Sequence, residues 1–267
     1  MNGQSMTSPA QTSIVTAMKH HWFYPRLLGF ALIAFLVVYA LVASGRFLYF
    51  RQAGLELAAF PRQDEYTVGS GKPVHQVAVA GDSTAFGTGA SAFTHTYHYQ
   101  YLSQQPGTFQ VQNVGAIGAR VSDVTEQLNN ISPVDLLFIS ISSNDVTHFT
   151  RLSDLSNQLD NMLTLAESKA DTVILITPGS MGDVGLLPWP VRTILGYRSG
   201  QVSVLTKEVA KNHQVIQVDM FSHSEYSFAR DPNINFAADL FHPSDTGYAL
   251  WANAISKDVE RAGGLRL

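Results

Sequence analysis

The sequence predicts an α/β domain in three layers, with a five-stranded parallel sheet, preceded by one membrane-spanning helix. Two observations lead to this prediction: an uncharged apolar run near the N-terminus, and a regular alternation of short apolar runs with longer helical segments after it. Short apolar runs are typical of strands buried on both faces. Strand and helix in alternation indicate a parallel sheet with helices on both sides.

Composition and charge exclude several kinds of function. Charged residues make up only 14% of the 267 residues, which suggests that part of the chain lies in lipid. The formal net charge of -4 provides no basic surface for nucleic-acid phosphates, so we expect no nucleic-acid partner. The chain has no cysteine, which excludes disulfides, thiolate nucleophiles and zinc bound by cysteine.

The apolar run covers residues 27–45 and contains no charged residue. It is long enough to cross a hydrocarbon layer of ~30 Å at ~1.5 Å per residue. We therefore expect an N-terminal tail over 1–26, a transmembrane helix over 27–50, a linker over 51–73 and a folded domain over 74–267. A cleaved signal peptide is one alternative, although its apolar region is usually shorter, at roughly 7 to 15 residues. A buried core helix is another, but the run lacks a polar stripe.

The orientation of this helix rests on weak signals. Positive charges are nearly balanced on its two sides, and the short tail contains no acidic residue. We expect a single-pass membrane protein with the tail inside and the folded domain outside the cytoplasm.

Within the folded domain, strands and helices follow one another in order. The expected strands cover residues 75–80, 109–114, 134–141, 172–177 and 214–218. The expected helices cover residues 90–103, 122–130, 152–170, 191–212 and 244–262. In such a sheet a ligand binds beyond the carboxyl ends of the strands, so residues directly after each strand are the candidates for function.

The first strand is followed directly by Gly81-Asp82-Ser83. This position exposes a serine hydroxyl on a tight turn at the carboxyl edge of the sheet, where a nucleophile meets its substrate. Alone, the tripeptide is ordinary turn chemistry. A phosphate-binding loop is a second alternative, but the segment lacks the Gly-Lys-Ser/Thr ending that such loops require.

Three further motifs follow later in the chain. They are NVGAIG at residues 113–118, SSND at 142–145 and DLFHP at 239–243. With Ser83, they resemble the four blocks of the SGNH or GDSL-type hydrolase family, which supply Ser, Gly, Asn and an Asp-x-x-His pair in that order. The resemblance covers roughly residues 74–262 and implies the flavodoxin-like, three-layer fold of that family. One departure is Ser142, because the third block usually reads Gly-x-Asn-Asp.

The resemblance implies a catalytic triad of Ser83 as nucleophile, His242 as general base and Asp239 as the group that orients the imidazole. The spacing is physically reasonable. Three residues separate Asp239 from His242, so the carboxylate can reach one imidazole nitrogen while the other faces Ser83. Without the other motifs, an aspartate and a histidine beside a helix cap would be the simpler interpretation.

The resemblance also implies an oxyanion hole. Its donors would be the backbone N–H groups of Ser83 and Gly118 and the side-chain amide of Asn144. Gly115 is the rival glycine, but the family's spacing from Asn113 favours Gly118.

The resulting hypothesis is a serine ester hydrolase, of the esterase, deacylase or lipase type, that acts through an acyl-enzyme on an ester of a lipid, an acylated glycan or a small molecule. One alternative is an acyltransferase on a cell-surface glycan, and another is an inactive binding module tethered to the membrane. The oligomeric state is not indicated. We expect no cofactor.

Two other segments contain residues with possible functions. His95 and His98 lie three residues apart, but no acidic partner follows at ligand spacing, so we expect no metal. The apolar loop 179–190 leaves the fourth strand at the active-site edge. It is suited to binding an acyl chain, to docking on a membrane surface or to simple packing over the core.

Overall fold

The computed structural model describes residues 9–58, 63–177, 179–223, 228–265 and 267, with side chains from Leu27 onward except that of Ala58. Residues 1–8 of the expected tail and 59–62 of the expected linker lie outside this description. The chain divides into two compact units, Met1–Leu48 and Tyr49–Leu267. The second unit contains the sheet and the candidate site.

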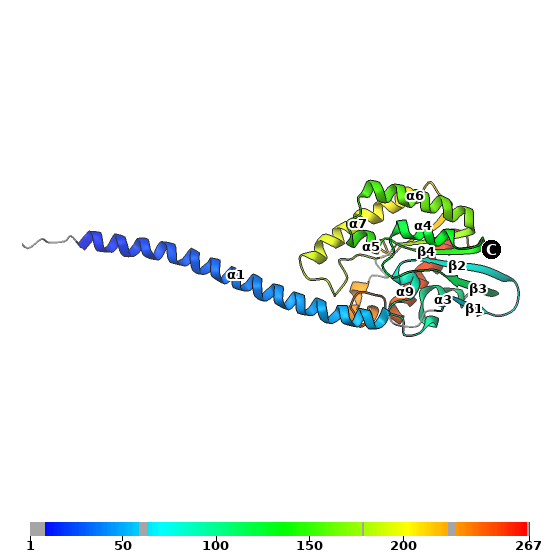
Figure 1. Cartoon of the computed structure of the whole chain (residues 1–267), viewed down its shortest axis with the longest axis horizontal. Coiled ribbons are helices and arrows are strands. Elements are labelled where there is room, and N and C mark those ends of the chain that lie inside the picture. The colour runs from blue at the N-terminus through cyan, green and yellow to red at the C-terminus, as the bar shows by residue number, and fades with distance from the viewer. Residues whose placement is uncertain (1–8, 59–62, 178, 224–227, 266) are drawn as a thin grey trace, which may run out of the picture. The chain divides into compact units, whose positions relative to one another are not determined.

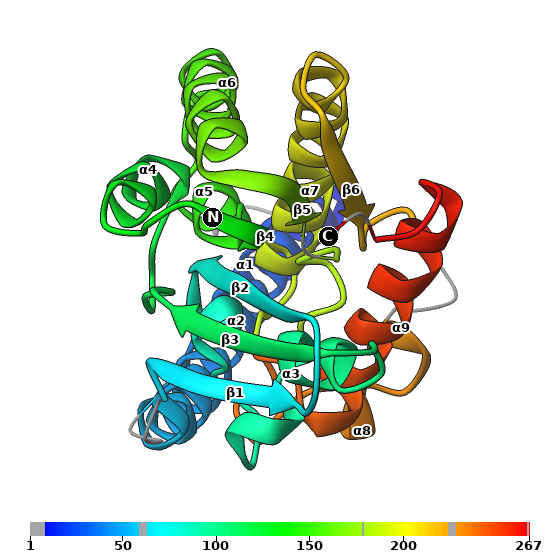
Figure 2. The same cartoon turned by 90° about the vertical axis from the view of Figure 1, so that its right-hand side faces the viewer.

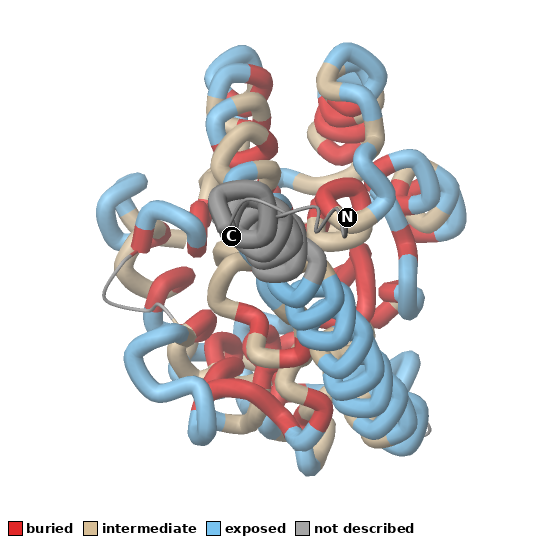
Figure 3. Tube along the Cα trace, turned by 90° about the vertical axis from the view of Figure 1, so that its left-hand side faces the viewer, coloured by how far each residue is buried: buried red, intermediate tan, exposed pale blue. Residues whose placement is uncertain are grey.

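The first long element is the helix α1, Pro9–Ala58. Its residues from Leu27 to Tyr49 are mostly exposed (Figure 3). Most of these exposed residues are apolar. The segment Leu27–Leu57 is long and apolar enough to cross a membrane, a property that signal sequences share. The helix does not stop at residue 50 but continues through 51–58, which the sequence analysis assigned to the linker.

In the described part of the chain, six strands form one mixed sheet in the order β1-β3-β2-β4-β5-β6 (Figure 2), of which Figure 1 labels β1 to β4. Five are parallel, as predicted: β2 Val74–Gly81, β3 Thr108–Asn113, β4 Val134–Ser140, β5 Ala170–Thr177 and β6 Val215–Asp219.

The expectation of five strands is wrong by one. Strand β1, Glu65–Gly69, lies in the expected linker and pairs antiparallel with β3, with Glu65 opposite Gln112. Only Val68 of this strand is buried, because β1 is an edge strand with one face open. Such a short and mostly polar segment gives a weak strand signal in the sequence.

The helices follow the predicted order. The longer ones are α3 Tyr97–Leu102, α4 Val121–Asn129, α6 Leu152–Lys169, α7 Val191–Ala210 and α9 Asp245–Arg261. Short turns of helix are α2 Ser83–Phe86, η1 Phe93–His95, α5 Ser143–Thr147, η3 Phe228–Arg230 and α8 Pro232–Asn235. The expected helix 90–103 is wrong in its first half, because Thr96 has an extended backbone and separates η1 from α3.

The sheet is covered on both faces. Helices α4, α6 and α7 lie on one face and α3 and α9 on the other (Figure 2). Neighbouring strand residues point to opposite faces. In β4, Leu137 and Ile139 therefore join the first core, and Leu136 and Phe138 join the second. This confirms the three-layer α/β architecture.

The order of strands also fixes where a ligand can bind. The chain passes from β2 to β3 on one side of β2 and then crosses to β4 on its other side. In open α/β sheets the crevice beyond the carboxyl ends at such a reversal is the usual ligand site. Here Ser83 follows β2 and Asn144 follows β4, so both side chains lie at this reversal.

Candidate active site

Ser83 is the first residue of α2, directly after the turn that ends β2. Asp82 caps this helix, since its Oδ1 accepts hydrogen bonds from Thr84 N at 2.9 Å and from Thr84 Oγ1 at 2.7 Å. Thr84 Oγ1 also lies 2.5 Å from Oγ of Ser140, at the end of β4. Burial raises the pKa of Asp82, although the bonds from Thr84 act in the opposite direction. The serine turn is therefore fixed to two strands.

The turn from Asp239 to His242 brings the other two predicted residues to Ser83. Asp239 Oδ2 accepts a hydrogen bond from His242 Nδ1 at 2.6 Å, and His242 Nε2 lies 3.0 Å from Ser83 Oγ. Asp239 Oδ1 accepts the backbone N–H groups of Phe241 and His242, each at 3.0 Å. Burial raises the pKa of Asp239, but the hydrogen bonds and charge of His242 outweigh it and hold the pKa below its ordinary value. The carboxyl, imidazole and hydroxyl groups thus form one hydrogen-bonded line.

A glycine allows the serine loop to approach the histidine turn. Gly89 has a φ of +96°, and a Cβ there would lie 2.3 Å from the carbonyl oxygen of Pro243 and 3.1 Å from Cβ of His242. Only glycine fits this backbone and this space. Nothing in the sequence around Gly89 points to this contact, because it joins segments that are far apart in the chain.

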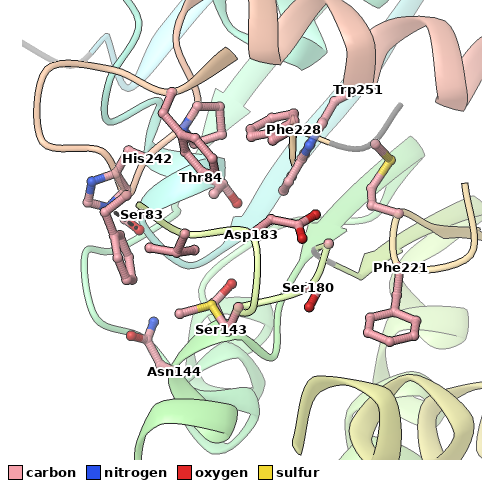
Figure 4. Close-up of a pocket in the computed structure, with 17 residues that line it drawn as sticks. Ser83, Thr84, Ser143, Asn144, Ser180, Asp183, Phe221, Phe228, His242 and Trp251 are labelled. Atoms are coloured by element: carbon pink, nitrogen blue, oxygen red, sulfur yellow. Dashed lines mark hydrogen bonds between the residues drawn. The ribbon is translucent and has the colours of Figure 1, made fainter. Parts of the chain in front are cut away.

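Asn144 belongs to α5 and lines the same cavity as Ser83 and His242 (Figure 4). Its Nδ2 donates a hydrogen bond to Ala119 O at 2.9 Å, and the neighbouring Asp145 accepts one from Val121 N at 3.1 Å. These two bonds tie the loop after β3 to the loop after β4. The amide of Asn144 has a second N–H for a ligand in the cavity.

The two rival glycines have different surroundings. A Cβ on Gly115 would lie 2.8 Å from Phe86 N, so this glycine is required for close packing against α2. Gly118 has a φ of +81° and is exposed, and a Cβ there would have no neighbour within 4 Å. Of the two glycines, Gly118 therefore has the backbone that is accessible to a ligand.

Ser142 is the position at which the sequence departs from the family it resembles, which has glycine there, and it adopts a backbone typical of glycine. Its φ is 91° and its ψ is −11°. The carbonyl oxygen of Ser142 accepts a hydrogen bond from Val146 N at 3.0 Å. Helix α5 therefore begins with its usual backbone hydrogen bond although the residue is serine. The side chain is buried, and its hydroxyl has no hydrogen-bond partner in the described part of the chain.

The cavity beside Ser83 is mostly apolar. Figure 4 shows Ser83 and His242 at one end of it and Phe221 and Trp251 toward the other. Its apolar walls are Met181, Val184, Met220, Phe221, Phe228, Phe236, Phe241 and Trp251. Met181 and Val184 come from the loop 179–190, so part of that loop lines the cavity and is buried in the core. The aromatic walls from after β6 and from α9 were missed, because single aromatic residues in distant segments carry no sequence signal for a shared cavity.

The two histidines considered for metal binding have separate partners. His95 Nδ1 lies 2.9 Å from Asp245, whereas His98 is buried and its Nδ1 lies 2.6 Å from Tyr66 OH. Burial lowers the pKa of His98 to about 3, so it is a neutral packing residue. Over the ranges that the structure describes, no three His, Asp or Glu side chains are grouped to hold a metal.

Comparison with known proteins agrees with this architecture. Residues 79–250 match the model of the GDSL-like lipase/acylhydrolase family. The chain is 23% identical over 213 residues to the GDSL-like esterase Rv1075c of Mycobacterium tuberculosis, covering 73% of this chain and 68% of that protein.

Two solved structures share the fold. One is the acetylxylan esterase Axe2 of Geobacillus stearothermophilus, with a TM-score of 0.52, 19% identity and coverage of 72% of this chain and 95% of that one. The other is a lipolytic protein of the G-D-S-L family from Veillonella parvula, with a TM-score of 0.53, 18% identity and coverage of 71% and 100%.

Proposed function

The chain belongs to the GDSL-like lipase/acylhydrolase family, and on this basis we propose that it hydrolyses a carboxylic ester through an acyl-enzyme formed on Ser83. The observation that carries the proposal is the line of hydrogen bonds from Asp239 through His242 to Ser83, with distances of 2.6 and 3.0 Å, at the edge of an apolar cavity. Solved variants of Axe2 described as catalytic mutants replace a serine, an aspartate and a histidine. That aspartate and histidine stand three positions apart, as Asp239 and His242 do, which supports the assignment.

The distances support the following mechanism. Ser83 Oγ attacks the ester carbonyl while His242 Nε2 removes its proton, and Asp239 stabilises the imidazolium that forms. His242 then gives the proton to the departing alkoxide, which leaves as the alcohol. Water, deprotonated by His242, attacks the acyl-enzyme and releases the carboxylic acid and free Ser83.

The charge that develops on the carbonyl oxygen requires donors. We assign this role to the backbone N–H groups of Ser83 and Gly118 and to the Asn144 amide. The exposed backbone of Gly118 and the place of Asn144 in the cavity support the assignment. One such donor typically contributes ~2.7 to 4 kcal/mol of transition-state stabilisation.

The walls of the cavity favour an apolar acyl group longer than acetyl. Aromatic rings and methionines surround the space beyond Ser83. Each methylene buried against them contributes roughly 0.8 kcal/mol, which corresponds to about a fourfold gain in kcat/KM. The family name does not specify the length of the acyl group. The apolar lining of the cavity favours esters with a longer acyl chain.

We also propose that α1 anchors the protein in a membrane as a single span and that the catalytic unit lies outside the cytoplasm. The exposed apolar side chains from Leu27 onward support the anchor, because such a surface is stable in hydrocarbon and unfavourable in water. A reporter fused after Leu267 tests the orientation, and activity of that reporter only in the cytoplasm would reverse it.

The function is tested with the full-length protein in detergent micelles. We expect turnover of p-nitrophenyl esters, with kcat/KM increasing from acetate to butyrate and hexanoate, and labelling by a fluorophosphonate probe. Ser83→Ala abolishes both. If the folded protein neither hydrolyses any of these esters nor reacts with the probe, the proposed function is wrong, and a flat or decreasing length profile would refute the acyl assignment alone.

A further inference from the structure

The last turns of α1 belong to the folded unit that contains the candidate site. This terminal segment, residues 49–57, includes Phe50, which packs against the core formed with α4, α6 and α7. Farther along, Glu56 and Leu57 share a surface depression with Ala237 and Ala238, just before Asp239. The segment therefore lies along the chain that leads into the Asp-His turn.

Gly54 is the point of closest approach. A Cβ on Gly54 would lie 3.3 Å from Oδ2 of Asp239, 3.6 Å from its Cβ and 3.9 Å from its Cγ. Glycine destabilises the interior of a helix, so its presence at this contact is explained by the space available and not by helix propensity. Gly45 of the same helix provides a comparison, because a Cβ there would have no neighbour within 4 Å. A larger residue at position 54 would therefore press on Asp239, whereas a larger residue at position 45 would meet no neighbour.

The helix backbone covers the one carboxylate on which His242 depends. Asp239 Oδ1 accepts two backbone N–H groups, and Oδ2 accepts His242 Nδ1 at 2.6 Å. Gly54 lies against that same Oδ2, and the Asp239 side chain is only 2% exposed. Excluding water around a charged hydrogen bond strengthens it, and a packed neighbour fixes the orientation of the carboxylate.

We propose that the terminal segment of α1 packs against the Asp239 carboxylate and that Gly54 is a positioning residue, which sets the place of this carboxylate and through it the imidazole of His242. This inference rests on the proposed roles of Asp239 and His242. It gives residues 49–57 a role separate from the proposed anchor, because Gly54 lies against the carboxylate of the proposed triad.

The test compares Gly54→Ala with the matched control Gly45→Ala in the full-length protein in detergent micelles. At Gly54 the new methyl group displaces Oδ2 by a few tenths of an ångström, whereas at Gly45 it meets nothing. Since a misplacement of about 1 Å can cost about 100-fold in rate, we expect kcat to fall about threefold to tenfold in Gly54→Ala and about 100-fold in Gly54→Leu. KM remains unchanged in both, and Gly45→Ala retains the full kcat.

A double-mutant cycle separates positioning from general damage. In an Asp239→Ala background the carboxylate is gone, so we expect Gly54→Ala to cause no further loss of kcat. Thermal unfolding provides a readout without activity. Both glycine-to-alanine changes favour the helix, but Gly54→Ala should raise Tm more in the Asp239→Ala background than in the wild type, whereas Gly45→Ala raises it equally in both.

The outcomes are distinguishable. If the wild type hydrolyses no ester, the proposed function fails, and the Tm cycle still decides whether Gly54 and Asp239 are coupled. Equal kcat and equal Tm changes for Gly54→Ala and Gly45→Ala would overturn the positioning role. So would a loss in Gly54→Ala that persists undiminished when Asp239 is alanine.

Discussion

Replacing Ser142 with glycine should stabilise the protein, which is the opposite of what most substitutions do. Ser142 has a φ of 91° and carries a buried hydroxyl without a partner in the described part of the chain. Strain at a non-glycine residue in this region costs ~1 to 3 kcal/mol. An unsatisfied buried hydroxyl costs ~1 to 3 kcal/mol.

Two effects oppose the gain. Glycine gives the unfolded chain more freedom, which costs ~0.4 to 1 kcal/mol. The buried methylene of serine is also lost, at ~0.8 kcal/mol. Taking these terms together, we expect Ser142→Gly to increase the free energy of unfolding by about 2 kcal/mol, which raises Tm by about 4 to 8 °C in a domain of this size.

The assay is thermal unfolding of the full-length protein in detergent, followed by tryptophan fluorescence. Ser142→Ala is the matched control, because it removes the hydroxyl and keeps the Cβ at positive φ. Alanine removes the unsatisfied hydroxyl, a gain of ~1 to 3 kcal/mol, without either opposing term, so we expect it to raise Tm about as much as glycine does. If the glycine variant is less stable than the alanine variant by the full ~1.2 to 1.8 kcal/mol of the two opposing terms, the backbone at this position is not strained. If both lower Tm, the hydroxyl has a partner and the reasoning about burial fails.

Three other predictions concern catalysis and pH. Asn144→Ala should lower kcat by about 100- to 1000-fold with a smaller change in KM, because one oxyanion donor is lost, and steady-state kinetics would show whether it does. Asp239→Asn should lower kcat by roughly 10,000-fold while Ser83 remains in place, since the amide holds His242 in the wrong tautomer; a fall below tenfold would remove Asp239 from the triad. Burial lowers the pKa of His213, but hydrogen bonds and charges from Glu167 and Asp160 outweigh it and raise the pKa above its ordinary value. The Tm advantage of the wild type over His213→Gln should therefore be complete below about pH 6.5 and disappear as pH rises through the raised pKa, and an advantage that grows with pH would contradict this.

The central sheet could be predicted from the sequence because each parallel strand is a short apolar run buried on both faces. The expected strand at 134–141, for example, is β4 at Val134–Ser140. Strand β1 could not be predicted in this way, because it lies at the edge of the sheet and only one of its five residues, Val68, is buried. The break at Thr96 was missed because it depends on one extended residue within a segment of helical composition.

The candidate site was predictable to the extent that its residues follow strand ends. Ser83, Asn144 and the Asp239–His242 turn are each local motifs, and the parallel order brings them to one edge of the sheet. The contact of Gly54 with Asp239 was beyond sequence reasoning, because it joins residues 185 positions apart through the packing of a helix end. The same applies to Trp251, which reaches the cavity from α9.

Between the catalytic aspartate and histidine proposed above stands Leu240, a non-glycine residue with a φ of 54°. Its carbonyl oxygen accepts Leu186 N at 3.1 Å, so the loop that supplies Met181 and Val184 to the cavity is bonded to the turn that carries His242. A substrate that pushed this wall outward would pull on the carbonyl of Leu240, two residues before His242. If His242 is the base, as proposed above, this hydrogen bond links ligand size to base alignment, and we expect a poorly fitting ester to suffer from a misplaced proton acceptor as well as from weaker binding.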